Sequence, residues 1–422
     1  MDINSILKGV NCNCGHFHSC DIERVYIEKD AAKRFKDLCC GYNKILIVAD
    51  ENTYNVGGES VERGLADKSL TKVIFSGSKL LIPDEAAIAA VEEKTDGIEL
   101  LIGIGSGVIQ DLCKYVSHDK NIPYMIFATA PSMDGYASSG AAMILKGMKV
   151  TVAAGVPKAI VADTKILKDA PFEMIAAGYG DIIGKYSALC DWKLSRAVNN
   201  EYFCTYIYDL TYKMIEKTLL LADGIIKRDE ESIGVLTEAL ITVGILMSFA
   251  GSSRPASGSE HHLSHFFEIT GILDDKEYFP HGIDVAYSTV ITARLREQML
   301  KKDFPDSKFV ESKETYTEKM NEIYKSAADG CIQLQNKIGN YKKDRMSVYN
   351  AKKDEIRDIL SEVPSGDKIE AMLKPMGFDM DKFYNMYGIN KIKTAVKYAK
   401  DLKDRYTVLW LNYDLFGGTI EI

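Results

Sequence analysis

The chain has 422 residues, of which 46% are hydrophobic and 27% are charged. These proportions are those of an ordinary soluble globular protein, and the length predicts about two or three domains. The net charge of −8 gives no support to nucleic-acid binding, which usually shows as an excess of basic residues.

Neither membrane insertion nor secretion is expected. The longest apolar run, at about 239–251, begins directly after Glu238 and is too short to cross a bilayer, so it predicts a buried helix. The N-terminus lacks the basic start and apolar core of a signal peptide. Nine scattered cysteines, an odd number, are typical of reduced thiols in a cytoplasmic protein.

One group of thiols and imidazoles stands apart near the N-terminus: Cys12, Cys14, His16, His18 and Cys20. This density is suited to zinc, although the spacings match no familiar zinc motif. The alternative is a strand edge that carries reduced thiols. The sequence assigns no role to the cluster.

From residue 44 onward, apolar strand-like runs alternate with helical patterns. The strands are predicted at 44–50, 71–77, 98–107 and 122–132, the helices at 82–97 and 108–119, and a turn-rich stretch at 51–58. A further strand-like stretch, 149–167, closes this part. Continuous apolar runs separated by helices predict a parallel sheet covered on both faces. We expect an α/β dinucleotide-binding domain over residues 1–168.

After Pro171 the helical period dominates, which predicts an all-helical domain over residues 169–422. The first expected helices are 171–193, 201–220, 230–251, 259–271 and 282–300, with more up to about 410.

The glycines Gly103, Gly105 and Gly107 follow a predicted strand and precede a helix. Backbone N–H groups in such a loop can hold a pyrophosphate. Position 108 is valine, so the loop departs from the G-x-G-x-x-G fingerprint, and a plain strand-to-helix turn is the alternative. Asp50 ends the first strand, where an acid could bind the ribose of NAD or could cap a helix.

A second loop, at 128–138, leaves the fourth strand on the same edge of the sheet. Its hydroxyls come from Thr129, Ser132 and Ser138, and its carboxylate from Asp134. Turn chemistry alone would explain the Asp-Gly pair, and a functional role is favoured only because this loop and the glycine loop share one edge of the sheet.

Four of the seven histidines lie within 257–281. His261 and His265 are four residues apart, so on a helix they share a face, whereas His262 points about a quarter-turn away. Two of these imidazoles, or one together with His281, could bind a divalent metal with a carboxylate from elsewhere. A polar helix start with surface histidines is the alternative.

Three segments carry a resemblance to a known family: GYGDIIGKYSALCDWKLS (178–195), SRPASGSEHHLSH (253–265) and FPHGIDVAYSTV (279–290). They are similar to segments of sn-glycerol-1-phosphate dehydrogenases, in the superfamily of iron-type alcohol dehydrogenases, glycerol dehydrogenases and dehydroquinate synthases. The resemblance covers about 44–294, and TAPSMDGYAS with SRPASGSEH favours the glycerol-1-phosphate branch. It implies a dehydroquinate synthase-like fold.

The resemblance also implies a metal held by Asp181, His261 and His281, with His265 near the substrate. His261 is preferred to His262 as the first histidine ligand because of its spacing to His265, and His262 is then expected on the helix surface. Zinc or nickel is implied for this branch and iron for relatives. The residues implied for NAD(H) or NADP(H) are Gly105, Gly107, Val108, Asp111, Thr129, Ser132 and Ser138, together with Asp50. The residues expected at the substrate are Asp134, Asp181, Lys185, Arg254 and His265.

The expected reaction interconverts dihydroxyacetone phosphate and sn-glycerol 1-phosphate, with the metal as Lewis acid on the C2 oxygen. His265 and Asp134 are the expected proton relay. The alternatives are a metal-dependent polyol or alcohol dehydrogenase, a dehydroquinate synthase-like lyase and a non-catalytic nucleotide-binding protein. The expected partners are a phosphorylated three-carbon substrate and a second copy of the chain, with no nucleic acid.

Overall fold

A computed structural model describes residues 3–79, 81–145 and 148–422. The chain divides into two compact units, and each is described by itself. The first comprises residues 1–182 and 213–253, and the second comprises residues 183–212 and 254–422. The helices α7 (Phe172–Asn199) and α8 (Thr205–Leu220) each contribute to both units.

A six-stranded parallel sheet is the centre of the first unit. Its strands, in spatial order, are β3 (Arg24–Glu28), β10 (Ala159–Asp163), β7 (Tyr124–Ala128), β6 (Leu100–Gly105), β4 (Lys44–Asp50) and β5 (Ser69–Phe75). From β4 the chain turns first to β5 on one side and then to β6 on the other. The strand order therefore reverses between β4 and β6, the point at which open α/β sheets bind ligands.

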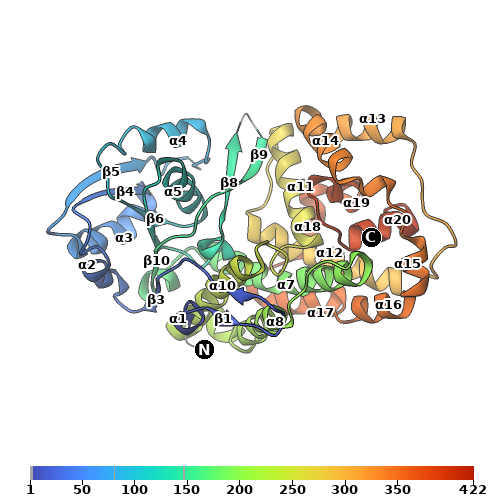
Figure 1. Ribbon diagram of the computed structural model, residues 1–422, viewed down its shortest axis with the longest axis horizontal. Coiled ribbons are helices and arrows are strands. Elements are labelled where there is room, and N and C mark those ends of the chain that lie inside the picture. The colour runs from blue at the N-terminus through green and yellow to red at the C-terminus, as the bar shows by residue number, and fades with distance from the viewer. Residues whose placement is uncertain (1–2, 80, 146–147) are drawn as a thin grey trace. The chain divides into compact units, whose positions relative to one another are not determined.

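Both faces of this sheet are covered, as the continuous apolar runs predicted. Ile45 and Ile47 pack toward Val61 of α3 (Glu51–Gly64). Leu46 and Val48 instead join the apolar cluster of α4 (Glu85–Glu92) and α5 (Gly107–Lys120). Figure 1 shows α4 and α5 above the strands and α3 below them. Because neighbouring residues of β4 point to opposite faces, a strand buried on both sides shows no polar alternation.

Two predictions about secondary structure in this unit were wrong. The stretch 51–58, expected as turns, is the start of α3, because Asp50 and Thr53 form a reciprocal cap at its N-terminus. Gly57 is buried within that helix, where an added Cβ would lie 2.7 Å from the ring of Phe127. The stretch 149–167, expected as one strand, is divided among β9 (Met148–Ala153), β10 and α6 (Thr164–Lys168).

The remaining elements of the first unit are short, apart from one long helix. They are α1 (Ile3–Ile6), β1 (Val10–Asn11), β2 (Phe17–His18), η1 (Ala31–Arg34), α2 (Phe35–Leu38), η2 (Asp134–Ala137), β8 (Gly140–Leu145), α9 (Ala222–Ile226) and α10 (Glu230–Ala250). By length and composition α10 could cross a membrane, but 72% of its most apolar stretch is buried inside the protein. It packs against η2 and α6, as a core helix does.

The described residues of the second unit form helices joined by loops, and none of them forms a strand. Its helices are α11 (Ser259–Asp274), α12 (His281–Leu300), α13 (Lys313–Tyr324), η3 (Lys325–Ala327), α14 (Ala328–Ile338), η4 (Asn340–Lys342), α15 (Met346–Ala351), α16 (Lys353–Ser361), α17 (Gly366–Leu373), η5 (Lys374–Met376), α18 (Met380–Tyr387), α19 (Ile389–Tyr398), η6 (Ala399–Leu402) and α20 (Val408–Phe416). The predicted order, an α/β part followed by a helical part, is confirmed.

A buried ion pair links several helices of the second unit. One carboxylate oxygen of Asp191 accepts hydrogen bonds from Arg296, at 3.0 Å, and from the backbone N–H of Val408, at 2.8 Å. The other accepts from the backbone N–H of Ser259, at 2.6 Å. Burial raises the pKa of Asp191, while Arg296 acts in the opposite direction. This network fixes the start of α11, the helix that carries the histidines.

Candidate active site

The glycine loop lies at the carboxyl end of β6, beside the point where the strand order reverses. Gly105 ends the strand and Gly107 begins α5. An added Cβ at Gly105 would lie 2.6 Å from Ile109, so packing excludes any side chain there. At Gly107 the nearest atom would be Cε of Met133, 3.9 Å away. Gly105 is therefore required by the fold, whereas Gly107 leaves open space in front of the helix.

The N-terminus of α5 has the properties of an anion site. Ser106 is its N-cap residue, yet its side chain makes no capping hydrogen bond. The first N–H groups of a helix have no partner within the helix, and the helix dipole adds positive potential there. A 14-residue helix that begins this way, with a glycine at its first position, is suited to a pyrophosphate.

Asp50 lies at the carboxyl end of β4, where the sequence placed it. Its Oδ1 accepts a hydrogen bond of 3.0 Å from the backbone N–H of Thr53, and the Thr53 hydroxyl lies 3.2 Å from the backbone nitrogen of Asp50. The helix-cap interpretation of Asp50 is thus correct for one oxygen of the carboxylate.

A buried lysine that the sequence did not single out orders the second loop. The Nζ of Lys114, on α5, donates hydrogen bonds to the carbonyl oxygens of Gly135, at 3.2 Å, and Gly140, at 2.8 Å. It also contacts the hydroxyl of Ser138, at 3.2 Å, and Oδ1 of Asp111, at 3.4 Å. Burial lowers the pKa of Lys114, although the Asp111 carboxylate acts in the opposite direction. Two predicted cofactor residues, Asp111 and Ser138, therefore meet at one cation.

The rest of this loop is equally fixed. The backbone N–H of Thr129 donates to the carbonyl of Gly105, at 3.2 Å, which places Thr129 beside the glycine loop. The hydroxyl of Tyr136 donates to the carbonyl of Ala130, at 2.8 Å. Ser132 and Val108 are half-buried along the same edge of the sheet.

Asp134 and Asp181 meet within the first unit. The backbone N–H of Asp134 donates to Oδ2 of Asp181, at 3.0 Å, and Asp181 is fully buried on α7. Two helical glycines make room for the loop. A Cβ at Gly178 would lie 1.9 Å from the carbonyl oxygen of Pro131, and a Cβ at Gly244 would lie 2.7 Å from that of Asp134. The backbone of the loop therefore packs directly on α7 and α10.

Three of the four clustered histidines lie together in the second unit. The ring centroids of His261 and His281 are 5.1 Å apart. The ring centroid of His265 lies 6.2 Å from that of His261 and 5.5 Å from that of His281. Two imidazoles that bind one ion through nitrogen at about 2.0–2.1 Å, with a tetrahedral angle, have centroids about 5 Å apart. The pair His261–His281 has this spacing, so the donor set fits a divalent metal.

The tautomer of His261 is set by its neighbour in the chain. Its Nδ1 lies 2.7 Å from Oε1 of Glu260, which is buried and also accepts from the backbone N–H of Gly258 at 2.8 Å. A carboxylate on one ring nitrogen leaves the other to bind a metal. Burial raises the pKa of Glu260, and the hydrogen bond from Gly258 opposes this. Nδ1 of His281 lies 3.4 Å from the hydroxyl of Ser264.

The expectation that His262 lies on the helix surface was wrong. His262 is fully buried, and neither ring nitrogen has a hydrogen-bond partner among the described residues. Burial, and then the positive charges of Lys403, Arg405 and Arg254, hold the pKa of His262 well below its usual range. His262 is therefore a neutral imidazole inside the unit, near three cations, of which sequence reasoning identified only Arg254.

Two basic residues expected at the substrate, Arg254 and Lys185, both have partners within the second unit. Arg254 forms an ion pair with Glu201, at 2.6 Å from its Nε, and donates to the carbonyl of Tyr406 at 2.9 Å. The Nζ of Lys185 is buried and donates to the carbonyl of Ala256, at 3.1 Å. Arg405 donates to the carbonyl of Ser257, at 3.0 Å. Burial, followed by repulsion from Arg254, lowers the pKa of Arg405 to about 10.

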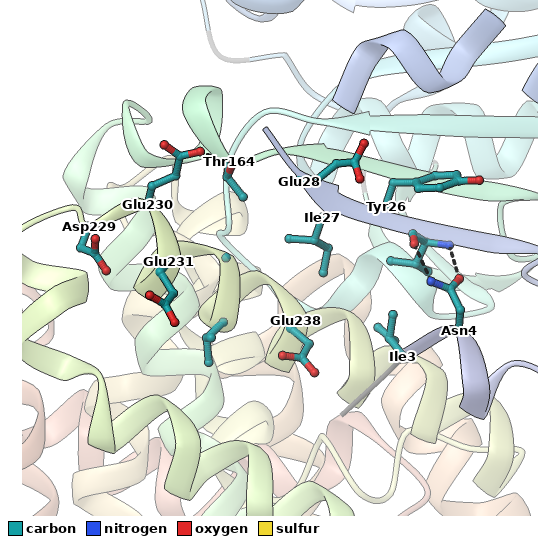
Figure 2. A pocket seen from close by; sticks show the side chains of 13 residues that line it. Ile3, Asn4, Tyr26, Ile27, Glu28, Thr164, Asp229, Glu230, Glu231 and Glu238 are labelled. Atoms are coloured by element: carbon teal, nitrogen blue, oxygen red, sulfur yellow. Dashed lines mark hydrogen bonds between the residues drawn. The ribbon is translucent and has the colours of Figure 1, made fainter. Parts of the chain in front are cut away.

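A separate hollow of about 740 Å³ lies in the first unit (Figure 2). Acidic side chains from α10, among them Glu230, Glu231 and Glu238, line it together with Glu28. No basic residue occurs among its lining residues, so an anionic nucleotide or phosphate ester would be repelled there. This hollow is not the site of the predicted chemistry.

Comparisons with known proteins agree with this geometry. Residues 26–171 match a family model described as iron-containing alcohol dehydrogenase. The chain is 31% identical to a glycerol-1-phosphate dehydrogenase (NAD(P)+) of Geobacillus stearothermophilus, over 87% of this chain and 86% of that protein. It is 29% identical to the protein of the same name from Geobacillus thermodenitrificans, over 96% of both chains.

A solved structure of a probable glycerol dehydrogenase from Sinorhizobium meliloti has a TM-score of 0.59, with 95% of this chain and 93% of that chain covered. At 13% identity the likeness shows the shared fold alone. The fold is thus the dehydroquinate synthase-like fold of the iron-type alcohol dehydrogenases, and the identity across most of both chains shows that the chain belongs to the glycerol-1-phosphate dehydrogenase family.

Proposed function

We propose that this protein interconverts dihydroxyacetone phosphate and sn-glycerol 1-phosphate with NAD(H) or NADP(H). The observation that carries the proposal is the His261–His281 pair, whose ring spacing of 5.1 Å suits a shared metal ion. The relatives named as glycerol-1-phosphate dehydrogenases supply the substrate class.

The proposed metal ligands are Asp181, His261 and His281. Glu260 keeps the proton on Nδ1 of His261, so Nε2 is the nitrogen available to the ion. A bound divalent ion would supply Lewis-acid polarisation of the C2 carbonyl. Imidazole and carboxylate donors suit zinc, nickel and iron alike, and the proposal favours zinc or nickel.

The proposed cofactor site lies at the reversal of the strand order in the first unit. Gly107 and the open N-terminus of α5 would receive the pyrophosphate, because the backbone there has no Cβ in front of it. The other proposed contacts are Asp50, Gly105, Val108, Asp111, Thr129, Ser132 and Ser138. Lys114 holds the loop of Ser138 against α5 and so acts as a positioning residue.

The proposed substrate contacts are Asp134, Asp181, His265, Lys185 and Arg254. His265 lies beside the two histidine ligands, and it and Asp134 are the candidates to pass a proton to the C2 oxygen.

A phosphate would be attracted by the cations around His262. Arg405 and Lys403 join Arg254 there. Because Arg254 already pairs with Glu201, its charge is partly balanced, and the two additional cations strengthen the case for a dianionic substrate.

The test begins with protein purified without chelator, whose bound metals are measured. Reduction of dihydroxyacetone phosphate and of unphosphorylated dihydroxyacetone is then followed at the nicotinamide absorbance with each cofactor. Preference for the phosphorylated substrate is expected. Equal or greater turnover of dihydroxyacetone would indicate a polyol dehydrogenase, and no net change in NADH with either substrate would argue against a dehydrogenase.

The ligand assignment has its own test. His281→Ala should lose metal and turnover together, because two remaining ligands hold a divalent ion poorly. Retained activity with full metal content would contradict the assignment. We also propose that the protein acts in the cytoplasm as a homodimer. Sedimentation of the purified chain would check the oligomeric state.

A further inference from the structure

The N-terminal thiols lie on a small hairpin. β1 and β2 pair antiparallel, with Val10 opposite His18. In the turn, the backbone N–H of Gly15 donates to the carbonyl of Cys12, at 3.0 Å, and Gly15 has a φ of +87°. A left-handed residue favours glycine, and here it closes the turn between the cysteines and the histidine. The turn therefore brings Cys12, Cys14 and His18 to one side.

His18 is held in one tautomer by helix α10. The ring is 1% exposed, and its Nδ1 lies 3.1 Å from the carbonyl oxygen of Phe249. A carbonyl oxygen can only accept, so Nδ1 carries the hydrogen. The Nε2 of the neutral ring then presents a lone pair, and it lies 3.4 Å from Sγ of Cys14. Histidine ligands of metals are oriented in this way, by an acceptor on the other ring nitrogen.

The distances among the donor atoms fit a small ion. The ligand atoms of Cys12, Cys14 and His18 all lie within 4.8 Å of one another. With Zn–S of about 2.3 Å and Zn–N of about 2.0 Å, tetrahedral ligands are separated by about 3.5 Å for sulfur and nitrogen and about 3.8 Å for two sulfurs. The separation of 3.4 Å between Cys14 and His18 is close to the first value. A hydrogen bond from the Cys14 thiol to Nε2 of His18 would explain the same distance without a metal.

We propose that Cys12, Cys14 and His18 bind a structural zinc ion that is separate from the catalytic metal. These three residues supply two thiolates and one imidazole, a donor set typical of zinc sites. Thiolates select zinc over the harder ions that carboxylates accept. Binding requires each thiol to lose its proton to solvent, so zinc uptake releases protons.

The consequence of the ion would be a fixed N-terminus. His18 is attached to the last turn of α10 through Phe249, whose carbonyl is one of those left over at a helix end. The same helix carries Gly244, which packs on the backbone of Asp134. Zinc would thus tie the hairpin to the helix that supports the substrate loop. The proposal rests on the hairpin alone and does not need the proposed reaction.

Cobalt substitution tests the site without any variant. Full-length protein is refolded or exchanged with Co²⁺ and its absorption is recorded. Thiolate ligands give a strong sulfur-to-cobalt charge-transfer band in the near ultraviolet, which the nitrogen and oxygen ligands proposed for the catalytic site do not give. The band is expected in the wild type. Its absence from protein that has bound cobalt would overturn the proposal.

Metal analysis of matched variants provides the second measurement. Cys14→Ser should lose about one equivalent of zinc per chain and the charge-transfer band, since a structural site binds one ion. His281→Ala should lose the catalytic metal but keep the zinc of the hairpin and the charge-transfer band, which separates the two proposals. Cys20→Ser is the matched control, because Cys20 is a thiol of the same segment that does not belong to the group of ligand atoms within 4.8 Å of one another. Unchanged zinc in both Cys12→Ser and Cys14→Ser would overturn the proposal.

Discussion

Gly178 is the point at which a single methyl group should disturb catalysis most selectively. In Gly178→Ala the new Cβ would lie 1.9 Å from the carbonyl oxygen of Pro131, a backbone atom. Real Cβ contacts are essentially never below 3.0 Å, so the loop or the helix must move by at least 1.1 Å, the difference between the two distances. The loop that moves carries Asp134, whose N–H bonds to Asp181 at 3.0 Å.

The magnitudes favour a loss of activity over a loss of fold. Alanine gains about 1 kcal/mol of helix propensity over glycine, and overpacking costs about 1–3 kcal/mol. The free energy of unfolding should therefore fall by no more than about 2 kcal/mol. A misplacement of about 1 Å can lower turnover about a hundredfold. We expect kcat for dihydroxyacetone phosphate to fall far more than the melting temperature does.

The matched control for Gly178→Ala is Gly234→Ala, on α10. There the nearest atom to the new Cβ is 3.5 Å away, an ordinary contact. This variant should be stabilised by about 0.5–1 kcal/mol and keep its turnover. The assay is steady-state kinetics beside thermal unfolding for both variants. Wild-type kcat in Gly178→Ala would refute the inference that the loop position depends on this contact.

Three further predictions concern the cofactor loop, the buried imidazole and the response to acid. Gly107→Ala should raise KM for the nicotinamide cofactor with little change in melting temperature, because its Cβ meets only Met133 at 3.9 Å. His262→Leu should keep its metal and unfold at an equal or higher temperature. A buried imidazole without hydrogen-bond partners lowers the stability by about 1–3 kcal/mol, and leucine removes that cost. Loss of metal from this variant would instead identify His262 as a ligand. Burial alone would raise the pKa of Glu311, but hydrogen bonds, the largest from Lys397, lower it overall. The Glu311 carboxylate therefore stabilises the folded protein above the unfolded pKa of about 4.3, and this stabilisation is lost as the pH falls through the folded pKa. Glu311→Gln should cost about 1.5–3 kcal/mol at pH 7 in urea unfolding and progressively less as the pH falls below about 4.3, and a cost that does not change with pH would contradict the assignment.

Local patterns in the sequence were sufficient for β4, β5, β6 and β7 and for the histidine helix, whereas β3 was not predicted and β10 was not separated from its neighbours. His261 and His265 share a face because four residues make about one helical turn, and the ring distance of 6.2 Å confirms it. The same rule failed for His262, because α11 packs against both α12 and η6 and has no exposed face at that point. A helix buried on several sides gives no amphipathic signal.

Contacts between distant segments were beyond the sequence for a different reason. From the sequence, Lys114 is an ordinary helical lysine. Its partners Gly135 and Gly140 are more than 20 residues away, so no local pattern shows these contacts. The residues three and four positions from Lys114 along the helix are Asp111, Ser117, Gln110 and His118, which are all polar, so the helical pattern gave no signal of its burial. The roles of Gly178 and Gly244 could not be predicted either. Each makes room for the backbone of a distant loop, and the sequence around a helical glycine does not show which segment packs against it.

His261 and His18 are both oriented through Nδ1, and their acceptors differ in a way that matches the two proposed roles. His261 has the carboxylate of Glu260 at 2.7 Å, whereas His18 has the neutral carbonyl of Phe249 at 3.1 Å. A carboxylate raises the basicity of the opposite nitrogen and offsets charge near an ion that must polarise a substrate. A carbonyl only fixes the ring, which is sufficient where thiolates already supply the negative charge. Replacing Glu260 with glutamine should therefore weaken metal binding at His261 about 10–100-fold and leave the cysteine site unchanged.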